Sequence, residues 1–262
     1  MKHYIKHIVY ITLVAGLFTA CNKEDLNVKK AMQIVVNGYN GGQNALQMSI
    51  DTTEYNVNVG YGKYIMSSAS IIGYSVVYSY GSDKKRLFTL TDTITKQVVY
   101  SKELPASGTK AIFNYIFLEG KELDINTPAA DPATNKLGFY IYYPTSNEPF
   151  DIFLYKKDNT TGQEFRAYIA KNVTPGKWIY VDYVAVADFG TKSFLGNSTV
   201  YFTKAGTTDQ WAFDNDQSKS TVGANTFFLP TVNDLGLVQP YFYKPMPYGQ
   251  GLAKMFFYPD RT

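Results

Sequence analysis

Leu46-Gln47-Met48-Ser49-Ile50-Asp51 is the stretch of the 262-residue sequence that decides the fold class. Apolar and polar side chains alternate along it without interruption, as they do in a β-strand with one face in a core and the other in water. Similar short runs recur along the chain, separated by turn signals rich in Gly, Ser and Asp. No helical period stands out beyond the N-terminal segment. The sequence therefore predicts an all-β protein.

The candidate strands fall into two series with a break between them. The first covers 32–36, 46–51, 74–80, 87–92, 96–104 and 111–118, and the second covers 137–143, 150–156, 164–172, 177–186, 198–203, 225–229, 238–243 and 254–258. Residues 125–136 contain two prolines and little to bury, which predicts a linker. Many short strands at this spacing predict two tandem antiparallel β-sandwiches, over residues 31–124 and 137–262.

The two series share a pattern. Leu46 to Ile50 corresponds to Phe150 to Leu154, and each stretch follows a strand and a loop containing Gly, Pro or Asn. Such internal similarity indicates two copies of one domain. The alternative is a texture that exported β-proteins have in common.

The N-terminus predicts export and lipidation. Lys2 and Lys6 precede an apolar run of 11 residues at 8–18, shorter than the roughly 20 residues needed to span a bilayer, so residues 1–20 are expected to be a cleaved signal peptide. Residues 17–21, Leu-Phe-Thr-Ala-Cys, resemble a bacterial lipobox, with Phe18 where Leu or Val is usual. This resemblance implies that Cys21 carries lipid and anchors the mature chain to a membrane. A chance cysteine near the end of a signal is the alternative.

The residues after Cys21 predict the location of the protein. Lys23-Glu24-Asp25, within an expected tether over 21–30, resembles the export signal that sends Bacteroidota lipoproteins to the external face of the outer membrane. A solvated tether on the periplasmic face is the alternative. With its lipobox, this tether and its repeated strands, the whole chain resembles Bacteroidota surface lipoproteins of unknown function. The resemblance implies that the two sandwiches are immunoglobulin-like.

Composition excludes several kinds of chemistry. His3 and His7 both lie in the predicted signal and Cys21 is the sole cysteine, so the mature chain lacks the residues for Ser-His-Asp or Cys-His catalysis, for histidine-based zinc sites and for disulfides. Removing Lys2 and Lys6 from the 25 basic residues leaves 23, against 22 acidic residues. This balance gives no reason to expect nucleic acid as a partner.

Carboxylates are the remaining candidates for catalysis, as in glycoside hydrolases. Five of them lie in the second half: Asp182, Asp188, Asp209, Asp214 and Asp216. At strand ends and turns, however, Asp is usually a local hydrogen-bonding residue. Residues 214–218 place oxygens at alternate positions, but Lys219 and Asn225 stand where a calcium loop needs Gly and Glu. We expect a polar turn there, and no metal or cofactor.

Aromatic residues give the strongest indication of function. Phe153 and Tyr155 occupy the strand face that Gln47, Ser49 and Asp51 keep polar in the first copy, so this face is either covered or binds a ligand. Four further rings are candidates for a ligand platform: Trp211, Tyr241, Tyr243 and Tyr248. Rigid rings with polar tips suit sugar or protein surfaces. Burial of the same rings between the two domains is the alternative.

These observations predict a non-catalytic surface lipoprotein that binds a glycan or a protein, as an accessory of polysaccharide uptake. A structural or fimbria-like adhesion subunit is the second reading, and a carboxylate-based glycoside hydrolase is the third.

Overall fold

A computed structural model describes residues 29–55, 58–59, 62–63, 65–81, 85–249, 251–256 and 258. The predicted signal peptide, Cys21 and the Lys23-Glu24-Asp25 motif lie outside the described residues. Within the described part, no helix is both long enough and apolar enough to cross a membrane.

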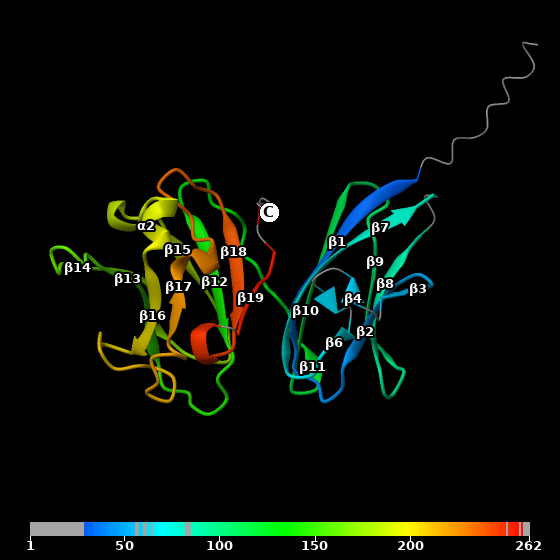
Figure 1. The fold of residues 1–262 in the computed structure, drawn as a ribbon, viewed down its shortest axis with the longest axis horizontal. Coiled ribbons are helices and arrows are strands. Elements are labelled where there is room, and N and C mark those ends of the chain that lie inside the picture. The colour runs from blue at the N-terminus through cyan, green and yellow to red at the C-terminus, as the bar shows by residue number, and fades with distance from the viewer. Residues whose placement is uncertain are drawn as a thin grey trace, which may run out of the picture.

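The chain is all-β, as the alternation predicts, and its strands fall into two bodies (Figure 1). The first half contains β1 (Lys30–Asn40), β2 (Leu46–Ile50), β3 (Thr53–Tyr55), β4 (Asn58–Val59), β5 (Gly62–Lys63), β6 (Ile65–Met66), β7 (Ser70–Tyr80), β8 (Leu87–Asp92), β9 (Val98–Glu103), β10 (Lys110–Leu118) and β11 (Lys121–Glu122). The second half contains β12 (Asn135–Ile141), β13 (Phe150–Lys157), β14 (Glu164–Val173), β15 (Trp178–Tyr183), β16 (Thr199–Lys204), β17 (Thr221–Gly223), β18 (Val238–Tyr243) and β19 (Leu252–Lys254).

The second body repeats the strand order of the first. In the first body one sheet has the order β11-β10-β1-β7 and the other β3-β2-β8-β9, with β6 also pairing with β2. In the second body the orders are β19-β18-β12-β15 and β14-β13-β16-β17. The first strand of each body pairs in parallel with a late one, β1 with β10 and β12 with β18, and these main-sheet strands otherwise pair antiparallel. The two bodies are therefore alike in topology, with β2 and β13 in equivalent places.

Each body closes its two sheets around a separate hydrophobic core. Leu46, Met48 and Ile50, the apolar positions of the alternating stretch, lie in the core of the first body. Phe150, Ile152 and Leu154 take the same places in the second. Residues two apart lie on the same side of a strand, so the same alternating pattern directs the apolar side chains of β2 into the first core and those of β13 into the second.

The structure corrects two local predictions. The expected strand over 225–229 is instead a 3₁₀ helix, η2 (Ala224–Phe227), and the last described strand, β19, shares only Lys254 with the strand expected over 254–258. Residues 192–196 form a short helix, α2 (Lys192–Gly196), too brief to produce a visible helical period. The other short helical turns are η1 (Ala187–Phe189) and η3 (Pro247–Gly249).

The predicted linker ends before Asn135, because this residue already belongs to the first strand of the second body. Its side chain is fully buried, and its Nδ2 donates to the carbonyl oxygens of Tyr183 (3.1 Å) and Asp234 (2.8 Å). These bonds attach the start of β12 to two distant segments of its own sandwich.

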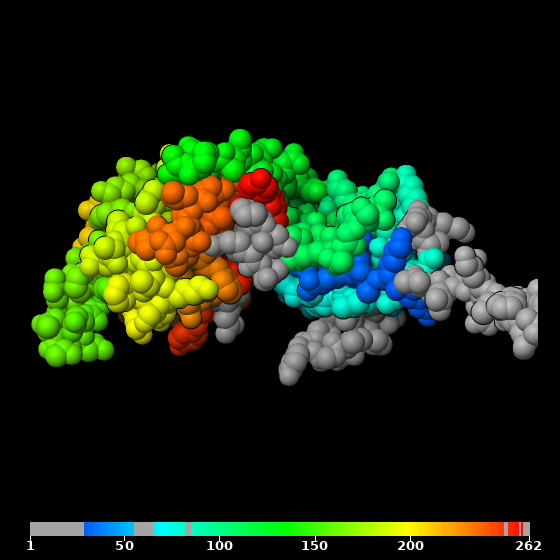
Figure 2. Space-filling view, turned by 90° about the horizontal axis from the view of Figure 1, so that it is seen from above, coloured from blue at the N-terminus to red at the C-terminus, as the bar shows by residue number. Residues whose placement is uncertain are grey.

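The two bodies meet through the sheets that contain their first strands. Tyr39 of β1 stacks on Phe242 of β18 at 5.0 Å, and Nζ of Lys244 donates to the Tyr39 hydroxyl at 3.0 Å. Nε1 of Trp178 donates to the carbonyl oxygen of Asp124 at 3.0 Å. Seen from above, the red end of the chain, which contains β19, lies between the two bodies (Figure 2). The sheet of β14, β13, β16 and β17 is consequently the one farthest from the first body (Figure 1).

Candidate ligand-binding surface

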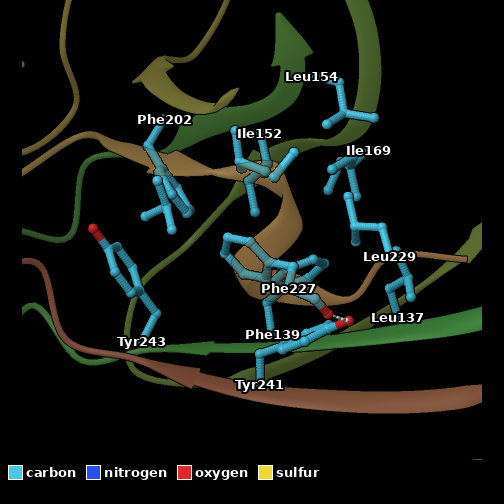
Figure 3. Packing of buried hydrophobic residues seen from close by; sticks show 14 of the residues in the cluster. Leu137, Phe139, Ile152, Leu154, Ile169, Phe202, Phe227, Leu229, Tyr241 and Tyr243 are labelled. Atoms are coloured by element: carbon cyan, nitrogen blue, oxygen red, sulfur yellow. Dashed lines mark hydrogen bonds between the residues drawn. The ribbon is translucent and has the colours of Figure 1, made fainter. Parts of the chain in front are cut away.

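Two of the four predicted platform residues lie inside the core. Tyr241 and Tyr243 are fully buried among the apolar side chains of the second sandwich (Figure 3). The Tyr241 hydroxyl donates to the carbonyl oxygen of Phe227 at 2.6 Å, and that of Tyr243 donates to the carbonyl oxygen of Lys219 at 2.7 Å. Burial raises the pKa of Tyr243 above its ordinary value. The prediction that these rings form part of a surface platform is therefore wrong.

The reason lies in the way β18 is covered on both faces. All six of its residues are buried, because one face lines the core and the other faces the first body. Tyr241 and Tyr243 point inward, whereas Phe242 between them enters the contact between the bodies. The alternative of burial between domains thus holds for Phe242 and not for the two tyrosines.

Tyr248 is exposed and stands apart from the other predicted rings. Its side chain is 83% exposed on η3, where its backbone has a φ of 60° and its N–H donates to the carbonyl oxygen of Ser218 at 2.8 Å. Among the described residues no ring contact joins it to Trp211.

Trp211 is the predicted residue that does belong to an aromatic surface. It forms an isolated bridge with Thr203 of β16, and its ring meets that of Tyr201 edge-on at 5.0 Å. Tyr201 in turn stacks on Tyr155 at 4.6 Å and contacts Phe153 at 5.6 Å. Trp211 therefore joins the strand face on which the sequence already placed Phe153 and Tyr155.

We call the set Phe153, Tyr155, Tyr168, Tyr201 and Trp211 the outer aromatic face. It covers the outside of the β14-β13-β16-β17 sheet. Phe153 lies at its centre with no exposed surface, and Tyr168, whose ring centroid is 5.4 Å from that of Phe153, is 42% exposed. The central ring is thus already covered, while the rings around it reach solvent.

Strand register explains why these side chains converge. Phe153 is directly opposite Tyr168 on β14 and Tyr201 on β16, and Tyr155 is opposite Arg166. Side chains opposite one another across a sheet have Cβ atoms about 4.5–5.5 Å apart. Sequence reasoning missed Tyr168, Tyr201 and Arg166, because alternation shows which residues share a side of one strand but not which strand lies next to it.

Cations lie against the outer aromatic face. The guanidinium carbon of Arg166 is 5.6 Å from the Tyr155 ring centroid, and Nζ of Lys171 is 4.0 Å from that of Tyr168. Arg166 also donates to a Glu164 carboxylate oxygen at 2.9 Å. Burial, as the main cause, raises the pKa of Tyr155 and of Tyr201 further above neutral pH, where a tyrosine hydroxyl at its ordinary pKa is already uncharged. The face therefore offers flat apolar area together with neutral and cationic hydrogen-bond donors.

Three of the five carboxylates considered for catalysis, Asp182, Asp214 and Asp216, bind neighbouring side chains or backbone groups. Asp182 pairs with Lys136, and Asp214 accepts from the Tyr143 hydroxyl and from Lys219, both at 2.6 Å. Asp216 accepts from the backbone and hydroxyl of Ser218 at 2.8 Å. These bonds hold the pKa of Asp214 and of Asp216 below the ordinary value. Residues 214–218 thus form the polar turn expected from the sequence.

Asp188 and Asp209 are both exposed, in η1 and in the loop after β16. Within the described part of the chain, no three His, Cys, Asp or Glu side chains gather closely enough to hold a metal ion.

The fold and this surface define an all-β, two-sandwich protein with an aromatic outer sheet. No family model and no curated protein matches the chain. Among solved structures, the chain is similar to the Bacillus anthracis TIE protein at 9% identity with a TM-score of 0.20, over 83% of this chain and 34% of that one. It is also similar to a leucine-rich repeat protein from Bacteroides thetaiotaomicron at 7% identity with a TM-score of 0.15, over 67% of this chain and 21% of that one. The chain thus spans well under half the length of either protein.

Proposed function

We propose that this protein is a non-catalytic, lipid-anchored binding module of the outer-membrane surface, and that its outer aromatic face binds a glycan. The observation that carries the proposal is the cluster of four contacting rings, Tyr155, Tyr168, Tyr201 and Trp211, that surround Phe153 and are partly exposed on the outer side of the β14-β13-β16-β17 sheet. Sugar rings present flat C–H surfaces edged by hydroxyls. Tyr and Trp match them with an apolar body and a polar tip.

The position of this face supports presentation away from a membrane. β1 begins at Lys30 in the first body, while the outer aromatic face belongs to the sheet farthest from that body (Figure 1). An anchor at Cys21 would place the first body near the membrane and the face at the far end. Acyl chains supply that anchoring, so Cys21→Ala is expected to release the protein from the membrane fraction. Retention of a correctly cleaved variant would contradict the lipoprotein assignment.

We propose that both domains are immunoglobulin-like in the sense that each is a sandwich of two packed sheets, without the strand order of antibody domains. Many surface and adhesion domains share a two-sheet sandwich without sharing the strand order of antibody domains. In the antibody constant domain the first strand pairs with the second, whereas here β1 lies between β10 and β7. What supports the designation is therefore the pair of packed sheets, tandem repetition and position behind a predicted tether.

A glycan array followed by titration calorimetry of the best ligand tests the proposal. Trp211→Ala and Tyr155→Ala should each weaken binding by roughly 1–3 kcal/mol, or about 5- to 150-fold in Kd. Tyr248→Ala is the matched control, because this ring is 83% exposed and, among the described residues, has no ring contact with the outer aromatic face. The same loss in all three variants, or no loss in the first two, would contradict a site on this face.

One observation favours the second reading, a structural or fimbria-like subunit. β7 is an edge strand of 11 residues that pairs only with β1 among the described strands, and its Val77 is 65% exposed. A long, unpaired edge is a template for adding a strand from another chain. Filaments of the purified protein in electron micrographs, together with an empty glycan array, would support this reading over the first.

A further inference from the structure

A groove lies between the two bodies, beside the contact of Tyr39 with Phe242. Its volume is about 390 Å³, which is within the range of small-molecule pockets, and such pockets occur preferentially at domain interfaces. β1, β7 and β10 form one wall, and the segment around β19 forms the other. Its apolar lining includes Val35, Ile71, Ile112, Leu252, Met255 and Phe256. The lining is therefore mostly hydrocarbon and comes from both copies.

The charged side chains that line the groove are both cationic. Lys110 of β10 and Lys254 of β19 take part in the lining, and no acidic residue of the described chain does. Burial lowers the pKa of Lys254. No ion pair among the described residues involves Lys254. Because a partly buried ammonium loses hydration, an anion beside it would restore favourable interactions.

Phe228 holds Lys254 at the groove. Nζ of Lys254 lies 3.7 Å from the centroid of the Phe228 ring, which also lines the groove. Phe228 has a φ of 50° at the end of η2, and its side chain is 56% exposed. A bulky residue in the left-handed region is uncommon and strained. This backbone conformation places an aromatic ring where it fixes the cation.

We infer that this groove binds a small amphipathic anion, with its apolar part against the hydrocarbon lining and its carboxylate or phosphate on Lys110 and Lys254. A neutral apolar molecule would leave the partly buried ammonium of Lys254 without a counter-charge. A sugar would find few hydrogen-bonding groups, since the Asn37 side chain in the lining already donates to the carbonyl oxygen of Met255 at 3.1 Å. The groove is thus distinct in chemistry from the outer aromatic face.

Gly73 provides a way to close the groove without disturbing the sheet. It lies on β7 opposite Asn37 and lines the groove, and a Cβ at this position would meet no atom within 4 Å. A leucine there extends into open space rather than into neighbouring atoms. Gly73→Leu should therefore occupy the volume that the ligand needs while the sandwich remains folded.

Titration calorimetry of the purified protein with decanoate, decyl phosphate and decanol tests the inference. Either anion should bind at least about tenfold more tightly than decanol, and the tighter of the two identifies the preferred head group. Gly73→Leu should weaken binding of all three probes by at least about tenfold. Lys254→Met should weaken binding of the anions by at least about tenfold and change that of decanol by less than about twofold.

Two matched variants control for general effects. Gly196→Leu fills another position where a Cβ meets no atom within 4 Å, and Lys102→Met removes another lysine whose Nζ faces a ring, 5.6 Å from the Tyr100 centroid. Both should leave binding unchanged, and melting curves should show that all four variants are folded. Equal affinity for decanoate, decyl phosphate and decanol would overturn the inference. So would unchanged anion binding in Lys254→Met, which remains informative if Gly73→Leu fails to fold.

Discussion

The two copies differ most on the outside of the sheet that contains their second strand. On β2 the outward residues include Ser49, whose hydroxyl lies 2.6 Å from that of Thr89 on the neighbouring strand. On the equivalent β13 the outward residues include Phe153 and Tyr155, which meet Tyr201. The inward residues of both strands are apolar and lie in the cores. The second sandwich therefore has the same core pattern as the first and a different outer face, which is where we place the ligand.

The neighbouring edge strand differs as well. In the first copy the edge of β2 is divided between the short strands β3 and β6. In the second copy β14 runs for 10 residues along β13, with irregular register near Ile152. The longer strand carries Arg166 and Tyr168 to the outer aromatic face. The long, continuous strand β14 is thus one reason why the second copy has an aromatic outer face and the first copy does not.

The largest expected effect concerns what the copies share, a tyrosine buried in each core. Tyr115 of β10 is 1% exposed and Tyr241 of β18 is fully buried. Tyr115→Ala and Tyr241→Ala should each lower the free energy of unfolding by about 3–5 kcal/mol, because a large ring leaves a cavity. Chemical denaturation followed by tyrosine fluorescence and circular dichroism measures this loss. A loss below about 1 kcal/mol for Tyr241→Ala would mean that its ring is a surface group after all.

A smaller effect separates the copies at one equivalent position. Asp151 of β13 is 3% exposed, and its carboxylate accepts from the backbone N–H groups of Asn172 and Gly206, both at 2.9 Å. Asn172 has a φ of 53°, so Asp151 stabilises an unusual backbone conformation. Asp151→Ala should lower the free energy of unfolding by about 2–4 kcal/mol, since two donors lose a charged acceptor.

Gln47 occupies the corresponding place on β2, and it is only partly buried. Gln47→Ala is the matched variant, expected to change the free energy of unfolding by less than about 0.5 kcal/mol. Chemical denaturation of both variants gives the measurement. Equal losses in the two would show that the outer faces have the same structural role.

Alternation predicts most strands of both copies because it is a local signal. Leu46 to Ile50 needs only its own residues to show one buried face. The strand order could not be predicted in this way, because it depends on which edges meet after the chain has folded back. The full membership of the outer aromatic face could not be predicted for the same reason. Tyr168 and Tyr201 lie beside Phe153 only because β14 and β16 pair with β13 in a particular register.

The sequence misplaces Tyr241 and Tyr243 for a related reason. β18 is buried at every position, so its residues show no polar alternation from which the inward side could be deduced. Pro240 and Pro245 on either side suggest a stiff exposed segment, whereas Pro240 is itself buried. Tyr241 and Tyr243 are buried in the core of their own sandwich, and the first body covers the other side of β18 at Phe242. This second cover is a tertiary contact that the local sequence does not encode, and it removes the polar side that would have shown which way the tyrosines point.

The smallest expected effect compares two turns that an aspartate closes in the same way, one in each copy, although they join different strands, β8 to β9 in the first copy and β13 to β14 in the second. The carboxylate of Asp92 accepts from the N–H groups of Ile94 and Thr95, both at 2.8 Å, and that of Asp158 accepts from those of Thr160 (2.8 Å) and Thr161 (3.0 Å).

In both turns the backbone hydrogen bonds favour the ionised form and hold the pKa of the aspartate below its ordinary value of 3.8. A depressed folded-state pKa contributes stability that is present above the unfolded value and is lost as the pH falls through the folded value. Stability should therefore decline below about pH 4, and the decline should be shallower in Asp92→Asn and in Asp158→Asn. Carbon-detected NMR titration of the two carboxyl groups gives the direct measurement.

Because Asp92 has an additional donor in the Asn44 side chain, at 2.9 Å, Asn44→Ala should raise the pKa of Asp92 and leave that of Asp158 unchanged. Two carboxyl groups that titrate at their ordinary value would show that these turns form without help from charge.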